Sequence, residues 1–230
     1  MELYNSSNIA EPLAECVNAL NDKVEGFVST GSGWSVDGIV SGSVHTATFD
    51  PIGGSGFLKT PAKLISKMAL TNIKNKDDRC LFYCMLAEKY KNVVDKRQTS
   101  RPKQYDPYFK ELNMQGIRLP VQLRQLEKIE KQNPEFSLNV LYYDEEEEKC
   151  FPLHVSRLTD RPIPVNMLLL TGVDEGGNSI GHYVLISDQS RLVYERSGHH
   201  GKAHVCLRCL NRFYDEKGLK EHGVLCGKKK

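Results

Sequence analysis

The apolar positions of this chain recur at helical spacing near its N-terminus. Residues 8–28 place an apolar side chain every three or four positions, which predicts an amphipathic helix. The apolar stripe consists of Ile9, Leu13, Val17, Leu20, Val24 and Phe27. A Ser- and Gly-rich joint at 29–33 ends this helix, and short strands broken by Gly38 and Gly42 follow it. We therefore expect residues 1–29 to form an N-terminal helix set apart from the domain that begins at residue 30.

Helical patterns in the middle of the chain give way to strand patterns. A polar turn over 71–79 leads into an apolar helical stretch that begins at Cys80. Helices are also favoured over 105–113 and 121–131. Strand candidates then follow at 137–142, 150–156, 165–171 and 182–187. This order predicts an α+β domain over 30–195 whose strands form an antiparallel meander.

An acidic run over 144–148 separates the first two strand candidates. Its four consecutive glutamates, Glu145 to Glu148, can indicate a metal site or a basic partner. Because the run joins two strands, we interpret it as a solvated hairpin loop.

The C-terminal segment carries ligand spacing for a metal. Cys206, Cys209, His222 and Cys226 form a C-x2-C-x12-H-x3-C pattern. A hairpin knuckle can present the first pair and one helix face the second pair, so that all four converge on one tetrahedral zinc ion. Phe213 and Leu219 lie where a ββα unit needs its two apolar core residues. The sequence therefore predicts a zinc finger over 205–230, after a linker at 196–204.

The C-terminal segment resembles the two-Cys, two-His zinc finger family, with cysteine in place of the last histidine. In that family, the base-reading residues stand at fixed offsets before the first zinc histidine. Those offsets correspond here to Asp215, Gly218 and Glu221, which are two carboxylates and one residue without a side chain. We therefore favour contact with a protein partner, or structural capping, over sequence-specific DNA reading. Nucleic acid stays open as an alternative partner.

Composition narrows the cellular setting but not the partner. The 230 residues carry a formal net charge of +2, which indicates neither a nucleic acid nor a membrane surface. The chain has no signal-peptide pattern and no apolar run of membrane-spanning length. Cys16, Cys80, Cys84 and Cys150 are scattered in apolar contexts, which favours a reducing compartment over a disulfide framework. We expect an intracellular protein, nuclear or cytoplasmic, without a membrane partner.

Cys80 has the position of an activated thiol. The N–H groups and the positive dipole end of a helix N-terminus lower a thiol pKa. His182 opens a later strand and can act as the base, and Asp188 can orient its ring. The structural alternative is that Cys80 and Cys84 line a buried helix face, while His182 is a strand residue with a satisfied hydrogen bond. Spacing alone leaves both open.

Two short motifs favour the catalytic alternative. The stretch Asp77-Asp78-Arg79-Cys80-Leu81-Phe82 resembles the Asp-Gly-Asn-Cys-Leu-Phe motif of ovarian-tumour-type cysteine proteases, and Gly181-His182-Tyr183 is similar to their histidine motif. The resemblance implies a papain-like fold, with Cys80 as nucleophile and His182 as general base. The backbone N–H groups from Asp77 to Cys80 would form the oxyanion hole. Asp78 and Arg79 depart from the family motif, as does the absence of its polar residue just after the histidine pair.

A second resemblance covers nearly the whole chain. Its motifs are Gly31-Ser32-Gly33-Trp34, Asn75 to Cys80, Glu130 to Asn133, His182-Tyr183, Ser190-Arg191-Leu192 and the closing finger. Their order resembles the region that precedes the protein-primed family B DNA polymerase in Maverick/Polinton transposons and adintovirus-like elements. The resemblance implies a mobile-element or viral origin and a role alongside DNA replication. Because the chain ends at Lys230 without exonuclease or polymerase motifs, we do not expect it to polymerise DNA.

Two functions follow as hypotheses. The first is a cysteine peptidase or deubiquitinase that cleaves ubiquitin-like conjugates or an element-encoded protein through a Cys80 thioester. The second is a non-enzymatic interaction module, in which the fold and the finger bind a protein partner or DNA. The peptidase requires Cys80 and His182 within hydrogen-bond reach in an open groove, whereas the module permits a buried thiol.

Overall fold

A computed structural model describes residues 54–173, 177, 179–193 and 203–226, together with scattered positions between 10 and 25. The chain divides into two compact units, Met1–Thr48 and Phe49–Lys230. In the first unit, the described positions are helical, as the apolar stripe predicted. The strand candidates around Gly38 and Gly42 lie outside the described residues, as does most of the predicted linker at 196–204.

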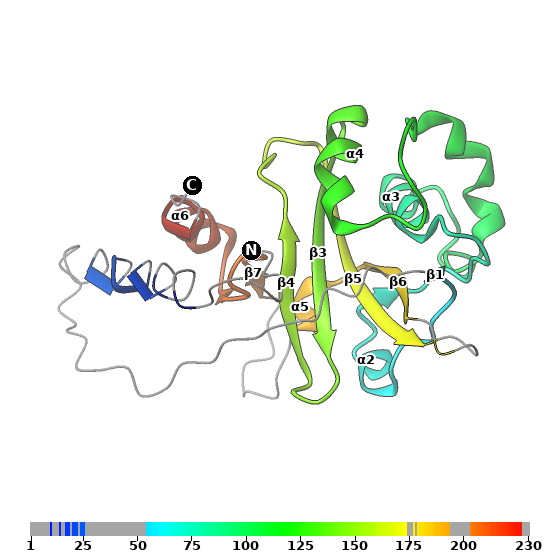
Figure 1. The fold of residues 1–230 in the computed structure, drawn as a ribbon. Helices are drawn as coiled ribbons and strands as arrows, with labels where there is room; N and C mark the ends of the chain where they lie inside the picture. The colour runs from blue at the N-terminus through cyan, green and yellow to red at the C-terminus, as the bar shows by residue number, and fades with distance from the viewer. Residues whose placement is uncertain are drawn as a thin grey trace. The chain divides into compact units, whose positions relative to one another are not determined.

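The second unit is built on a six-stranded mixed sheet with the strand order β1-β6-β5-β3-β4, in which β2 also pairs with β6 (Figure 1). The strands are β1 (Gly54–Ser55), β2 (Leu70–Thr71), β3 (Phe136–Asp144), β4 (Lys149–Val155), β5 (Ile163–Val173) and β6 (Ser179–Ile186). All four strand candidates of the sequence are confirmed as β3 to β6. The loop between β3 and β4 is the exposed acidic hairpin that was predicted, and the Asp144 carboxylate accepts the N–H groups of Glu146 and Glu147 at 2.9 Å.

The predicted antiparallel meander is wrong. β3 and β5 run parallel, with Leu138 opposite Val165, so that β5 lies between β3 and β6 while β4 is left at the edge. The burial of the two strands explains this order. β5 is buried at Met167 to Leu170, and such a run needs both faces covered, whereas β4 contains Pro152 and is mostly solvent-accessible, as suits an edge strand.

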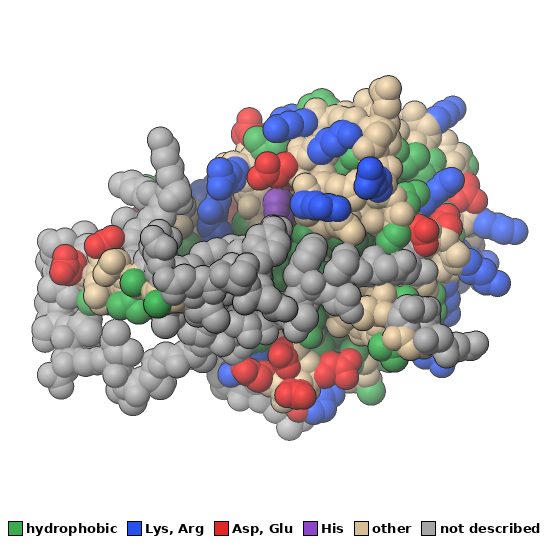
Figure 2. Space-filling view, viewed as in Figure 1, with side chains coloured by type: hydrophobic (Ala, Val, Ile, Leu, Met, Phe, Trp, Pro, Cys, Tyr) green, Lys and Arg blue, Asp and Glu red, His purple; other side chains and the backbone are tan. Residues whose placement is uncertain are grey.

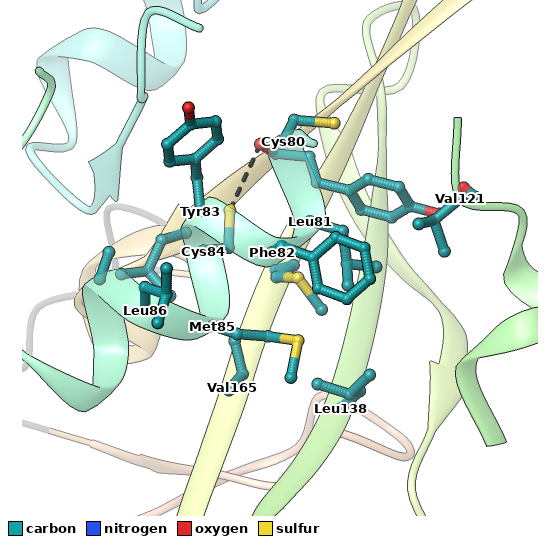
Figure 3. Close-up of a cluster of buried hydrophobic side chains, with 14 of the residues drawn as sticks. Cys80, Leu81, Phe82, Tyr83, Cys84, Met85, Leu86, Val121, Leu138 and Val165 are labelled. Atoms are coloured by element: carbon teal, nitrogen blue, oxygen red, sulfur yellow. Dashed lines mark hydrogen bonds between the residues drawn. The ribbon is translucent and has the colours of Figure 1, made fainter. Parts of the chain in front are cut away.

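Side chains alternate between two apolar clusters on opposite faces of the sheet. Along β6, Tyr183 and Leu185 belong to the first cluster, and Val184 and Ile186 belong to the second. The first cluster packs against α3 (Cys80–Lys89) and α4 (Leu126–Gln132), which lie on the same side of the sheet in Figure 1. The second cluster receives Leu64 from α2 (Ala62–Ser66) and Leu192 from α5 (Gln189–Leu192). α3 is therefore the central helix of the first face, as Figure 3 shows.

The predicted helices around the body are present in shortened form. α3 begins at Cys80, as expected from the polar turn before it. The stretch 105–113 forms the 3-10 helix η2 (Asp106–Glu111), which follows another, η1 (Pro102–Gln104). The stretch 121–131 forms η3 (Leu123–Gln125) and α4. No helix in the described part of the chain is both long enough and apolar enough to span a bilayer.

Met85 and Met68 provide a matched test of this packing. Met85 is fully buried in α3, whereas Met68 is 75 % exposed. We expect Met85→Ala to lower the free energy of unfolding by about 2–5 kcal/mol, because it removes core contacts and leaves a cavity. Met68→Ala should change it by less than about 0.5 kcal/mol. Urea denaturation measures both values, and equal effects of the two substitutions would contradict the placement of α3 on the sheet.

Candidate metal centre and the buried Cys80 region

Two short strands and a helix bring the four predicted metal ligands together. β7 (His204–Val205) pairs antiparallel with β8 (Arg212–Phe213), and α6 (Glu216–Cys226) follows. The turn between the strands carries Cys206 and Cys209, and it is closed by the Leu210 N–H, which donates to the Cys206 carbonyl at 2.7 Å. His222 and Cys226 are four residues apart on α6 and so share one face of the helix.

The ligand atoms of Cys206, Cys209, His222 and Cys226 all lie within 4.8 Å of one another. The Cys209 Sγ is 3.2 Å from the His222 Nε2, and the Cys206 Sγ is 4.0 Å from the Cys226 Sγ. A tetrahedral ion with metal–sulfur bonds of about 2.3 Å separates two sulfur ligands by roughly 3.8 Å. The group can therefore hold one tetrahedral metal ion.

The thiols of this group titrate unequally. Burial opposes ionisation of Cys206, but the backbone N–H groups of Cys209 and Arg208 outweigh it and hold the pKa of this thiol below its ordinary value. The pKa of Cys209 is instead raised to about 11, first by burial and then by the neighbouring thiols of Cys206 and Cys226. The negative charge of one thiolate therefore disfavours ionisation of the neighbouring thiol. A bound cation removes this penalty, which couples metal binding to proton release.

The two apolar residues predicted for the core of a finger, Phe213 and Leu219, lie in β8 and α6. The Phe213 ring is 4.6 Å from the His222 ring between centroids, and Phe213 and Leu219 are both half-buried. The Asp215 carboxylate accepts the Gly218 N–H at 2.7 Å and so caps the first turn of α6. Glu221 faces Lys217 at 3.9 Å. Asp215 and Glu221, two of the positions that correspond to base-reading residues, are thus already paired within the finger.

The metal-binding turn packs against the α+β body. Leu207 and Leu210 flank Cys209 in this turn and contact the second apolar cluster. The Ala203 N–H, just before β7, donates to the Ser190 Oγ in α5 at 2.8 Å. The finger therefore contributes apolar side chains to the body.

Cys80 lies at the first position of α3 with only 3 % of its surface exposed (Figure 3). Burial raises the pKa of its thiol to about 11, although backbone groups of Tyr183 and Leu81 favour the thiolate. Cys84, one turn further along, donates to the Tyr183 carbonyl at 3.4 Å, shown as the dashed line in Figure 3. The helix terminus thus acts on the Cys80 thiol as predicted, but desolvation exceeds its effect.

His182 is fully buried and hydrogen-bonded to an asparagine. Its Nε2 is 2.8 Å from the Asn72 Oδ1. The Asn72 amide donates to the Leu58 carbonyl and to the Thr60 Oγ1, both at 2.9 Å, so its oxygen faces the imidazole and accepts. Nε2 therefore carries the proton, and Nδ1 is left buried without a hydrogen-bond partner among the described residues. Burial lowers the pKa of His182 to about 4, against a smaller opposing effect of the Ile73 backbone.

The structure does not bring the predicted catalytic residues together as a triad. Within the described residues, no hydrogen bond links Cys80 to His182. The alternation of side chains along β6 places His182 on the same face of the sheet as Val184, opposite the face of Tyr183. Asp188 accepts the Arg191 N–H at 3.0 Å and caps α5 instead of facing the imidazole. The Asp77 carboxylate accepts the Arg79 N–H at 3.2 Å. The catalytic assignment of Cys80, His182 and Asp188 stays a prediction.

The role of Asn72 was not predicted from the sequence. It is the residue that fixes the His182 tautomer, yet it stands in a polar turn where asparagine is common for conformational reasons alone. A pairing across 110 residues of sequence leaves no local pattern.

Comparison of the chain with protein-family models, with curated proteins and with solved structures finds no match. Function must therefore be inferred from the geometry of the candidate sites and from the sequence motifs.

Alkylation of Cys80 tests its environment. With a thiol pKa of about 11, we expect slow reaction with iodoacetamide at neutral pH and a rate that rises toward pH 11. His182→Ala should leave this profile unchanged, because no hydrogen bond joins the two residues. The measurement is mass-spectrometric mapping of each cysteine in metal-loaded protein. Reaction with an apparent pKa below about 8.5 that is lost in His182→Ala would instead establish an activated thiol.

The buried imidazole of His182 makes stability depend on pH. The unfolded state binds a proton near pH 6.5, whereas the folded state resists it down to about pH 4, so stability is lost as the pH falls through this interval. The loss should be on the order of 3 kcal/mol. The loss should be absent from the pH profile of His182→Gln, measured by urea denaturation from pH 7 to pH 4. An unchanged profile in His182→Gln would show that the histidine is solvated.

Proposed function

We propose that the chain is a zinc-stabilised interaction module, in which the finger is held against a non-enzymatic α+β body. The convergence of three thiols and one imidazole within 4.8 Å carries this proposal. Soft sulfur and nitrogen ligands in tetrahedral reach favour zinc over hard cations such as magnesium or calcium. The Cys206 and Cys209 turn and the α6 face would hold the ion, and the ion would supply folding free energy to this short segment.

The surface of the finger fits a protein partner better than DNA bases. The Tyr214 side chain is 96 % exposed just before α6, and Val224 on α6 is 59 % exposed. Exposed aromatic side chains are typical of protein contact sites. Asp215 and Glu221 would in turn repel the phosphates of a DNA groove. These observations support a protein as the partner of the finger.

The α+β body fits a binding role because its thiol and its imidazole are both closed to solvent. A general base must reach the nucleophile directly or through one water molecule. Cys80 and His182 are each almost fully buried, and the shifts of their pKa values favour the neutral thiol and the neutral imidazole. The burial of both side chains supports a binding role over a catalytic one.

An ovarian-tumour-like thiol hydrolase is the second candidate. Backbone groups of Tyr183 and Leu81 favour the Cys80 thiolate, and Asn72 orients the His182 ring with an unprotonated Nδ1. This function needs an opening that brings Nδ1 to the thiol. The Cys80 alkylation profile separates the two candidates. The substrate would be an isopeptide or peptide bond in a ubiquitin-like or element-encoded protein.

The motif order along the chain supports a place alongside DNA replication. It resembles the region preceding protein-primed family B polymerases of Maverick/Polinton and adintovirus-like elements. The proposed role is therefore that of an N-terminal module of a replication protein from a transposon or virus.

Cobalt substitution tests the metal centre. We expect the apo chain to bind one Co²⁺ ion with thiolate charge-transfer and tetrahedral d–d absorption, and zinc to displace the cobalt. Cys209→Ser should weaken binding by more than about 100-fold, because even outer-shell changes cost 10–100-fold. Cys150→Ser, a cysteine of β4 outside the group, is the matched control. The metal proposal fails if the wild-type chain shows no tetrahedral spectrum, or if both variants lose it equally.

A further inference from the structure

Positive charge is concentrated in one part of the body. Residues 74–103 contain nine Lys and Arg residues against four Asp and Glu residues, a net charge of +5. The whole chain has a net charge of +2, so the other residues together carry −3. Five exposed side chains of this region define what we call the basic surface: Lys74, Lys96, Arg97, Arg101 and Lys103.

The fold brings two segments together to form the basic surface. The Lys74 N–H donates to the Ser100 carbonyl at 3.0 Å, so the loop before α3 lies beside the loop after it. Arg101 is the next residue along the chain. The second loop is held by the buried Tyr105, whose hydroxyl donates to the Thr99 carbonyl at 2.8 Å, and by the Gln104 to Gln98 side-chain hydrogen bond at 2.9 Å. The cations are thus fixed to a firmly anchored loop.

The cations of the basic surface differ from their neighbours in their ion pairing, although one carboxylate, that of Asp95, lies in the same loop and accepts the Arg97 N–H at 2.8 Å. Among the described residues, none of the five forms an ion pair. The neighbouring Lys89 contacts Glu111 and Glu135, and Lys91 contacts Glu88. The fold therefore pairs Lys89 and Lys91 with carboxylates, whereas the five cations of the two loops form no ion pair among the described residues. Mutual repulsion among like charges disfavours this arrangement unless a polyanion binds.

We propose that the basic surface binds the phosphate backbone of nucleic acid without reading its sequence. Closely spaced, unpaired Lys and Arg side chains match a regular row of phosphates. A protein interface has an apolar centre, but in the described segment 91–103 the exposed large hydrophobic is Val93. Figure 2 shows Lys and Arg side chains spread over the face of the body around α4 and α3, with Asp and Glu side chains among them. This surface lies on the α+β body, and the four predicted metal ligands are not part of it.

A cleft beside the basic surface is unsuited to the phosphate backbone of a nucleic acid. Lys96 also lines a cleft of about 550 Å³ whose other walls include Glu88 and Asp188. Carboxylates on these walls repel phosphates, so the backbone would follow the exposed loops instead.

Salt-dependent binding tests this proposal. Fluorescence anisotropy of the zinc-loaded full chain with a labelled 20-nucleotide single strand, and with its duplex, is measured from 50 to 200 mM NaCl. Five phosphate contacts predict a slope of log K against log salt of about −3.5 for the single strand and about −4.5 for the duplex. Affinity for the single strand should fall roughly 100-fold over this range. Two strands of unrelated sequence should bind equally.

A charge-matched pair of variants localises the site. Lys96→Gln, Arg97→Gln, Arg101→Gln and Lys103→Gln together should reduce the slope to about −1. The control substitutes the exposed Arg118, Arg124, Lys131 and Arg157 by Gln, which removes the same charge elsewhere, and it should retain the wild-type slope. Circular dichroism and zinc content confirm that both variants fold. The proposal is overturned if wild type does not bind at 50 mM salt, if both variants lose binding equally, or if poly-glutamate displaces the strand at equal charge.

Discussion

The burial of β6 on both of its faces is the constraint on which the rest of the structure depends. Tyr183 and Leu185 face α3, while Val184 and Ile186 face α2, α5 and the metal-binding turn. The strand also pairs with β5 along its length and with β1 and β2 on its other edge. Between those two short partners, the free stretch around Tyr183 receives the helix terminus that carries Cys80 and Cys84. One strand therefore positions the thiol, the imidazole and the surface on which the finger packs.

Desolvation separates the two cysteine groups of the chain. At Cys80, the backbone groups that favour a thiolate are too few to offset burial, so the thiol is neutral. At the finger, burial also acts on Cys206, but four ligands converge there and a divalent ion can compensate several charges at once. His182 follows the same rule, because its asparagine partner supplies a hydrogen bond but no charge. The protonation state of each cysteine and histidine is therefore set by the groups that surround it.

Local sequence patterns predicted many of the helices and strands. They did not predict contacts between residues that are far apart in the sequence. The helix at Cys80, the strands β3 to β6 and the four metal ligands follow from spacing that neighbouring residues dictate. The parallel pairing of β3 with β5 could not be predicted, because strand order depends on which strand needs both faces covered. Asn72 was missed for a related reason, since it meets His182 only through the fold. Asp188 looked like a triad member by proximity in sequence, but the adjacent helix α5 uses it as a cap.

The packing of Leu207 and Leu210 against the second cluster has a consequence for handling the protein. The turn that carries these leucines also carries Cys206 and Cys209, two of the four residues that could hold a metal ion. Loss of an ion bound there would loosen this turn and expose apolar surface on the body, and exposed apolar patches drive self-association. Self-association of the chain should therefore depend on its metal content.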